Sequence, residues 1–263
     1  MAATVGACTP PGDAHVAEGV PVEETPERWQ SGIELDDDRS GDLRPDAIAL
    51  MDARDRGEPS PAIALAWQPP STIRVWRRGL DGSSASCSGR VDVIPLETYV
   101  KGVLPHEWIR SWHRESLRAG AIAIRTYAAN WIMNGGKYSC ADLDDTTASQ
   151  VYRDERFPVT NAAVDATART FALKNGVPVF AEYSAENGHP TATGISDPPC
   201  AGKARYGHGR GTCQWGSQRW ATQAKSHAWI IAHYYPGASV VKVGGAPSSS
   251  FVVDNNNANN DAA

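Results

Sequence analysis

The feature that most constrains the fold is a run of small and apolar residues at helical spacing in the middle of the chain. Apolar side chains recur every three or four positions from Leu117 through Ile124 to Trp131, which is the period of one face of an α-helix. Residues 119–123 are mostly alanine and glycine, so another element can approach the helix backbone closely. The Asn-Gly-Gly sequence at 134–136 is a typical helix end. We therefore predict a long buried helix that organises the rest of the fold.

A single carboxylate stands ahead of this helix, in a predicted tight turn at residues 104–108. The turn reads Leu-Pro-His-Glu-Trp, which places Glu107 among the apolar neighbours Pro105 and Trp108. Apolar neighbours that exclude water favour the protonated form of a carboxyl group, and a general acid needs that form. From the local sequence alone, Glu107 is more simply interpreted as a surface glutamate before a helix, with no catalytic role.

Two short strands and a helix are predicted before this turn. Residues 72–76 and 90–94 alternate between apolar and polar side chains, which is typical of strands. Pro95 is suited to the first position of a helix, which we predict over residues 96–103.

The clearest local signal is a β-hairpin. Asn175-Gly176 separates apolar runs at 170–174 and 177–183, and Asn-Gly is the typical pair of a type I′ turn. Pro178 has no N–H to donate to a neighbouring strand, which indicates that its strand lies at a sheet edge.

Further helices are predicted around the hairpin. Thr160 is a suitable N-cap for a helix over 161–169, and a glycine-rich stretch leads into a helix over 218–224. Ser226 is a suitable cap for a last helix that stops at the Pro-Gly of 236–237. Together with the long helix and the hairpin, these elements predict the α+β class.

Composition divides the chain into three parts. Residues 1–45 are acidic, rich in proline and without periodicity, which predicts an extended arm. Residues 46–243 contain the predicted elements and form a single domain. Residues 244–263 contain a run of asparagines and are predicted to be a disordered tail.

The overall charge argues against one class of partner. The sequence has 25 basic and 30 acidic residues, a formal net charge of −5, so we predict no nucleic-acid binding. We also predict no membrane span, which takes about 18 consecutive apolar residues or more. The sequence does not begin with a signal peptide, and a signal removed during export would not be visible in it.

Cysteine usage predicts disulfides. In an exported protein, five cysteines without a CxxC spacing predict two disulfides and one unpaired thiol. We expect one bridge between Cys200 and Cys213, because both flank the same glycine-rich loop. The five residues are Cys8, Cys87, Cys140, Cys200 and Cys213.

Several motifs, taken in order, resemble the signature of a known family. The set resembles the stage II sporulation protein D (SpoIID) family of peptidoglycan lytic transglycosylases, and the resemblance covers residues 72–243. The motifs lie at residues 99–131, at Gln-Val-Tyr 150–152, at 183–191, in the glycine-rich stretch 207–216 and at Tyr-Tyr-Pro-Gly 234–237.

The resemblance implies a secreted cell-wall enzyme with a SpoIID-like domain and no cofactor. Such an enzyme cleaves peptidoglycan between N-acetylmuramic acid and N-acetylglucosamine, here with peptide-stripped glycan as the expected substrate. Most glycosidases use two carboxylates. A lytic transglycosylase needs one, which protonates the glycosidic oxygen and then takes the proton of the sugar's own C6 hydroxyl to close a 1,6-anhydro ring. Glu107 stands at the position of the family's catalytic acid.

Several other polar residues are candidate substrate-binding residues. Arg125 interrupts the apolar run of the long helix, where it must be paired or belong to a site, and we favour the site. For each of the others taken alone, a structural hydrogen bond is an equally good interpretation. The candidates are Arg125, Tyr127, Gln150, Tyr152, Ser184, His208 and Gln214.

Two other functions remain open. Relatives of the family resemble non-catalytic enhancers of cell-wall amidases, which bind glycan and activate a partner. Less favoured is a wall peptidase in which Cys213 is the nucleophile and His208 the base, since Cys213 precedes a predicted helix whose N-terminus favours a thiolate.

No metal site is predicted. Some family members resemble metalloproteins with paired cysteines and histidines before the Gln-Val-Tyr motif, whereas this chain has only Cys140 there and no histidine. A set of His189, Cys200, His208 and Cys213 has the right residue types for zinc, but not a familiar spacing.

Overall fold

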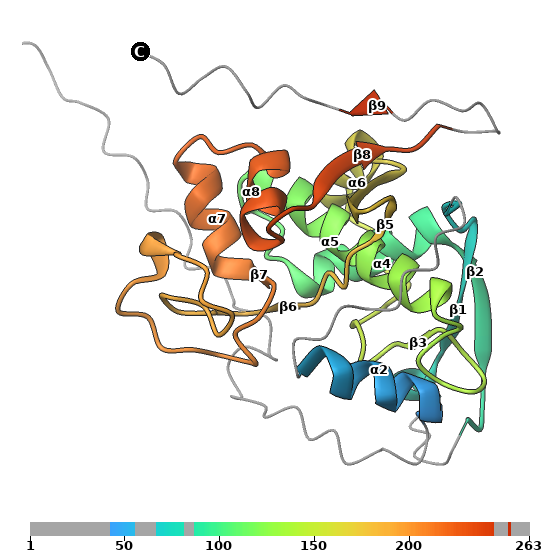
Figure 1. Ribbon diagram of the computed structural model, residues 1–263. Helices are drawn as coiled ribbons and strands as arrows, with labels where there is room; N and C mark the ends of the chain where they lie inside the picture. The colour runs from blue at the N-terminus through green and yellow to red at the C-terminus, as the bar shows by residue number, and fades with distance from the viewer. Residues whose placement is uncertain (1–42, 56–66, 82–86, 245–251, 254–263) are drawn as a thin grey trace, which may run out of the picture.

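The computed structural model describes residues 43–55, 67–81, 87–244 and 252–253, with helix α5 at its centre (Figure 1). The fold is α+β, as predicted. The predicted arm lies outside the described residues up to position 42. The elements are α2 (Pro45–Asp55), β1 (Thr72–Trp76), α3 (Arg78–Asp81), β2 (Val91–Pro95), α4 (Leu96–Glu107), α5 (Arg114–Met133), β3 (Leu143–Asp144), α6 (Pro158–Ala166), β4 (Thr170–Lys174), β5 (Val177–Pro178), β6 (Tyr183–Ser184), η2 (Pro198–Cys200), β7 (Thr212–Cys213), α7 (Gln214–Thr222), α8 (His227–Tyr234), β8 (Ser239–Lys242) and β9 (Val252–Val253).

Helix α5 is the predicted buried helix. Every residue from 119 to 131 is buried, and the helix contacts α4, α6, α7, α8 and β4. His113 caps its start, where the ring Nδ1 accepts the backbone N–H of Glu115 at 3.2 Å. Asn134 ends it. Because the helix is surrounded on all sides, its alanines and glycine determine how closely the other elements pack.

The first sheet has the strand order β2-β1-β3 and lies on the opposite side of α5 from α7 and α8 (Figure 1). The predicted strand pair is confirmed, with β1 antiparallel to β2 and Thr72 opposite Pro95. The prediction that α4 ends at residue 103 is wrong, because the helix continues through Pro105 to Glu107. A proline in the last turn removes one donor only, and the N–H of Trp108 still bonds to the carbonyl of Leu104 at 2.9 Å.

The second sheet has the order β5-β4-β8-β9 and contains the predicted hairpin. Asn175 and Gly176 have φ angles of 54° and 79°, as a type I′ turn requires. Strand β5, with Pro178, lies at the edge. Strand β9 comes from the predicted tail and pairs with β8, and the tail's other residues beyond Gly244 lie outside the described part.

Two helices begin earlier than predicted. Helix α6 starts at Pro158, so Thr160 lies inside the helix and its hydroxyl donates to the carbonyl of Phe157 at 3.1 Å. Helix α7 starts at Gln214, because Cys213 caps it through a hydrogen bond from the N–H of Gly216. The predicted cap of α8 is confirmed, since Ser226 accepts the N–H of Trp229 at 3.2 Å.

One disulfide joins the first sheet region to the loop after α5. It links Cys87 to Cys140. The predicted bridge between Cys200 and Cys213 is wrong, because both are free, buried thiols with their sulfur atoms 3.8 Å apart. Cys8 lies outside the described residues.

Removing this disulfide should destabilise the domain. The bond closes a loop across 53 positions, and chain entropy predicts a loss of about 4 kcal/mol from the free energy of unfolding for a loop of that length. We expect the double variant Cys87→Ser with Cys140→Ser to unfold at a lower urea concentration than wild type. Its free energy of unfolding should be lower by roughly the amount given above. An unchanged midpoint under oxidising conditions would contradict a formed disulfide.

Candidate functional site

Glu107 lies at the end of α4, where two distant segments meet it. The residue is only 1% exposed. The N–H of Val151 donates to its Oε1 at 2.8 Å. The side-chain Nε2 of Gln214 donates to the Glu107 carbonyl oxygen at 2.6 Å and lies 3.5 Å from Oε2. Three predicted motifs therefore meet at Glu107, and its two carboxyl oxygens have different contacts, Oε1 with the N–H of Val151 and Oε2 with Gln214 Nε2.

Gln214 has an unused acceptor beside this carboxyl group. Its Oε1 is buried and has no hydrogen-bond partner among the described residues. A buried amide oxygen without a donor costs free energy. This oxygen marks a position near Glu107 where a hydroxyl donor would be stabilised.

An aromatic wall lies next to Glu107. The Trp108 ring is completely buried and packs edge-on against Tyr183, with ring centroids 5.0 Å apart. Its Nε1 donates to the hydroxyl of Ser217 at 3.2 Å, and that hydroxyl also bonds to Ser116 of α5 at 2.7 Å. The indole is therefore fixed from both sides.

Gly120 allows this indole to lie against α5. A Cβ at Gly120 would fall 2.7 Å from two atoms of the Trp108 ring and 3.0 Å from the Leu104 side chain. Alanine normally stabilises a helix over glycine by about 1 kcal/mol. Here the contact dominates, and we expect Gly120→Ala to lower the free energy of unfolding by about 1–3 kcal/mol in urea denaturation. Gly244→Ala is the control, since a Cβ there meets nothing within 4 Å. A Gly120→Ala protein more stable than wild type would refute this packing.

Gln150 holds the aromatic wall in place. Its Oε1 accepts from the Tyr99 hydroxyl at 3.0 Å, and its Nε2 donates to the Tyr183 hydroxyl at 3.1 Å. Burial raises the pKa of Tyr99 well above its usual range, so its hydroxyl stays a donor. In this structure both ends of the Gln150 amide bond to the protein, which favours a positioning role over the predicted sugar contact.

Tyr152 is likewise built into the protein. Its ring stacks on Tyr99, with centroids 5.4 Å apart. Its hydroxyl donates to Asp154 and accepts from Arg156, both at 3.1 Å. Burial raises its pKa. Tyr152 follows Val151, so its packing fixes the N–H that binds Glu107.

Ser184 and His208 belong to one folded loop. The Ser184 hydroxyl donates to Asn187 at 2.6 Å and accepts the N–H of Gly209 at 3.1 Å. Gly207 has a φ of 91°, and a Cβ there would lie 2.7 Å from that of Ser184. His208 is partly exposed, and its Nδ1 accepts the N–H of Arg210 at 3.1 Å. Glycine at 207 is therefore required for the loop to lie on β6.

Arg125 lies inside the protein. It is 0% exposed, and its guanidinium binds both oxygens of Glu97, at 2.9 and 2.7 Å. It also donates to the carbonyls of Thr170 at 3.2 Å and Val164 at 3.4 Å. These contacts tie α5 to α4, α6 and β4, and they favour a structural role over the predicted substrate contact.

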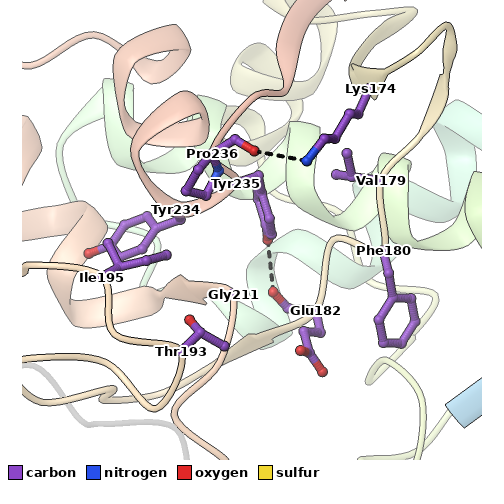
Figure 2. Close-up of a pocket in the computed structure, with 10 residues that line it drawn as sticks. All are labelled: Lys174, Val179, Phe180, Glu182, Thr193, Ile195, Gly211, Tyr234, Tyr235 and Pro236. Atoms are coloured by element: carbon purple, nitrogen blue, oxygen red, sulfur yellow. Dashed lines mark hydrogen bonds between the residues drawn. The ribbon is translucent and has the colours of Figure 1, made fainter. Parts of the chain in front are cut away.

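Tyr127 packs in an aromatic group next to a pocket. Its ring lies 5.2 Å from that of Phe180, and Phe180 lines a pocket of about 330 Å³. Figure 2 shows the Tyr235 hydroxyl pointing to the Glu182 carbonyl oxygen, at 2.8 Å. Glu107 does not line this pocket. Its lining residues are Lys174, Val179, Phe180, Glu182, Thr193, Ile195, Gly211, Tyr234, Tyr235 and Pro236.

The pocket adjoins the Glu107 site through the pair β6 and β7. These strands run parallel, with Tyr183 opposite Thr212. Glu182 and Gly211, which directly precede the paired residues, line the pocket, whereas Tyr183 packs on Trp108.

Cys213 and His208 do not form a favoured catalytic pair. Cys213 is 0% exposed, and its sulfur accepts the N–H groups of Asn187 at 3.2 Å and Gly216 at 3.1 Å. The Nδ1 of His208 already accepts a backbone N–H. Both side chains have structural partners, which weakens the peptidase interpretation.

Several residues that build the site are not predicted from the sequence. The backbone N–H of Val151, the ring of Tyr183 and the hydroxyl of Ser217 all shape the surroundings of Glu107. Ser217 could have been predicted as a site residue from its spacing, because it lies three residues after Gln214 and therefore on the same face of α7. A backbone N–H has no sequence signal.

The middle of the chain is similar to known proteins. Residues 85–188 match the model of the SpoIID family, described as stage II sporulation protein. An uncharacterized protein of Brachyspira hyodysenteriae (strain ATCC 49526 / WA1) is 38% identical over 97 residues, which are 36% of this chain and 26% of that protein. The protein named amidase enhancer of Bacillus subtilis (strain 168) is 41% identical over 90 residues, 34% of this chain and 12% of that protein. The chain thus spans about a quarter of the length of the first relative and about an eighth of the length of the second.

Proposed function

We propose, from the premise that this chain carries a SpoIID domain over residues 85–188, that it is a peptidoglycan lytic transglycosylase. In this proposal Glu107 is the single acid/base, and the bond cleaved joins N-acetylmuramic acid to N-acetylglucosamine. The observation that carries the proposal is the convergence of Val151 and Gln214 on the buried Glu107. The N–H of Val151 donates to its carboxyl group, and Gln214 Nε2 donates to its backbone carbonyl and lies 3.5 Å from Oε2.

The geometry supports a division of roles between the two carboxyl oxygens. Oε1 is held by the N–H of Val151 at 2.8 Å, which fixes the plane of the group. Oε2, with Gln214 Nε2 at 3.5 Å, is the oxygen we assign to proton transfer. It would protonate the glycosidic oxygen and then accept the C6 hydroxyl proton as the 1,6-anhydro ring closes.

A sugar hydroxyl suits the unused acceptor of Gln214. The buried Oε1 of Gln214 has no donor among the described residues, so a hydroxyl that reaches it gains a hydrogen bond without displacing one. We assign this oxygen to substrate binding. Among the other predicted contacts, His208 is partly exposed.

A single carboxylate fits the surroundings better than a hydrolytic pair. Three acidic residues in the loop before the Gln-Val-Tyr motif are engaged in ion pairs. Asp142 binds Arg74 at 2.7 Å, Asp144 binds Arg78 at 3.1 Å, and Asp145 binds Arg77 at 3.4 Å. Both side chains are buried in the pairs of Asp144 and Asp145, and a carboxylate held in such a pair is not free to activate water.

The pocket of Figure 2 is our candidate for the neighbouring sugar units. It is lined by the aromatic rings of Phe180, Tyr234 and Tyr235, and by Glu182 and Lys174. Aromatic faces with a few polar groups are typical of ligand pockets. Its position at β6 and β7 would extend a glycan strand away from Glu107.

The second candidate is a non-catalytic enhancer of a cell-wall amidase. It is favoured by one observation, the 41% identity over 90 residues to a protein named amidase enhancer. Under either function we propose a secreted protein that acts on the cell wall. None of the described helices is long and apolar enough to cross a membrane.

Product analysis separates these functions. The purified chain is incubated with intact and with peptide-stripped peptidoglycan, and the soluble products are identified by mass spectrometry. We expect products that end in 1,6-anhydromuramic acid, in higher yield from the stripped glycan. Reducing-end sugars would mean hydrolysis. No glycan product from either substrate, together with stimulation of an added amidase, would establish the enhancer.

A further inference from the structure

Three potential metal ligands meet outside the Glu107 site. They are Glu186, which follows β6, Cys200 at the end of η2, and Cys213 at the end of β7. Glu186 is 4% exposed and both cysteines are 0% exposed. Their ligand atoms all lie within 4.8 Å of one another. Three loops that are separate in the sequence therefore bring two thiols and a carboxylate to one buried point.

The spacing of these atoms suits a tetrahedral ion better than a disulfide. The two sulfur atoms are 3.8 Å apart, and Cys213 Sγ lies 3.4 Å from Glu186 Oε1. With zinc–sulfur bonds of about 2.3 Å and zinc–oxygen bonds of about 2.0–2.2 Å, tetrahedral angles place two sulfurs about 3.8 Å apart and a sulfur and an oxygen about 3.5 Å apart. A disulfide needs its sulfurs at about 2.05 Å.

The sulfur atoms are surrounded by N–H donors, as thiolates in metal sites need. Cys213 accepts the backbone N–H groups of Asn187 and Gly216, at 3.2 and 3.1 Å. Cys200 accepts from the guanidinium of Arg219 at 3.0 Å. Hydrogen bonds from N–H groups stabilise the anionic sulfur that binds metal.

Arg219 completes the charge balance from outside the ligand set. It binds the outer oxygen of Glu186, Oε2, at 2.7 Å, and so leaves Oε1 directed to Cys213. Two thiolates and one carboxylate carry three negative charges, and a divalent ion together with Arg219 neutralises them. The nearby buried carboxylate of Asp197 is held separately, by hydrogen bonds from Trp220 and Tyr234.

We propose that Glu186, Cys200 and Cys213 bind one zinc ion through three protein ligands, with Arg219 as the residue that orients Glu186 and Cys200. Two soft thiolates in tetrahedral spacing select zinc among the common divalent cations. From the sequence we predict no metal site, after considering Cys200 and Cys213 together with His189 and His208. In the fold the third ligand atom beside the two cysteines comes from Glu186 instead.

The ion would fix the start of α7. Cys213 is the N-cap of that helix, and the next residue, Gln214, bonds to Glu107. A metal ion at this site would therefore help to hold Gln214 against Glu107. The proposed metal site does not depend on whether the protein cleaves glycan.

Cobalt binding tests the proposal without any activity assay. The full chain, prepared metal-free under reducing conditions, is titrated with Co²⁺. We expect one equivalent to produce a thiolate-to-cobalt charge-transfer band in the near ultraviolet and visible bands of tetrahedral intensity, and Zn²⁺ to abolish both. Mass spectrometry of the native protein made with zinc in the medium should show one bound zinc.

Matched variants identify the ligands. Cys213→Ser keeps an N-cap acceptor for α7 and should weaken Co²⁺ binding more than about 100-fold, beyond the 10–100-fold typical of residues around the ligands. Cys200→Ser and Glu186→Gln should behave alike, and Arg219→Gln should weaken binding about 10–100-fold. Cys8→Ser is the control and should bind as wild type does.

Two results would overturn the zinc site. One is a Cys200–Cys213 disulfide in the native, unreduced protein, found as a linked peptide. The other is a reduced, folded protein that binds Co²⁺ without a charge-transfer band, or binds it equally well in the Cys213→Ser variant.

Discussion

Glu107→Gln should lower the rate of glycan cleavage by about 10²–10⁴-fold, the usual contribution of a general acid/base. The amide is nearly the same size as the carboxyl group and keeps an oxygen for the N–H of Val151, which now binds Oε1 at 2.8 Å. It cannot give a proton to the glycosidic oxygen or take one from the C6 hydroxyl. The rate is measured as release of 1,6-anhydro products from peptide-stripped peptidoglycan.

The control for this variant is Glu155→Gln. The Glu155 carboxylate is 65% exposed and pairs with His106, the residue before Glu107, at 3.4 Å. The Glu155→Gln variant removes one negative charge near the site and leaves the proposed acid unchanged. Its rate of glycan cleavage should therefore stay near that of wild type. Retained cleavage in Glu107→Gln would remove Glu107 from the mechanism. Loss of cleavage together with loss of glycan binding would assign it to binding.

Arg125→Met should lower the free energy of unfolding by about 2–3 kcal/mol, because it removes the hydrogen bonds of a buried guanidinium to a carboxylate that is 35% exposed and to two backbone carbonyls. The guanidinium of Arg125 is 0% exposed and binds both oxygens of Glu97. Methionine leaves Glu97 without this partner and leaves the carbonyls of Thr170 and Val164 without their donor. Urea denaturation followed by tryptophan fluorescence measures the loss.

Arg114→Met on the same helix is the matched control. Its side chain is 77% exposed, and its contact with Glu115 is 3.7 Å long, so its contribution is at most about 1 kcal/mol. If Arg125 bound glycan, as the sequence predicts, Arg125→Met would keep its stability and lose affinity for the glycan strand. That outcome would contradict the structural role.

The local predictions succeeded where neighbouring residues decide the conformation. The apolar spacing of α5, the Asn175-Gly176 turn and the Ser226 cap all act through interactions within a few residues, and the structure confirms each. The extension of α4 through Pro105 was missed because its last turn is secured by Trp108, which is anchored by Ser217 of α7. A contact across 109 positions leaves no local signal.

The sequence by itself determined the fold class, the central helix and the order of the motifs that meet in the site, because these depend on periodicity and residue type. Tertiary structure alone decided the partners of each polar side chain. It turned Arg125 from a predicted substrate contact into the partner of Glu97, and it placed Gln214 against Glu107. It also paired Cys87 with Cys140 and brought Cys200 and Cys213 to Glu186. Burial requires every charge and donor to find a partner, and which partner is near depends on how distant segments pack.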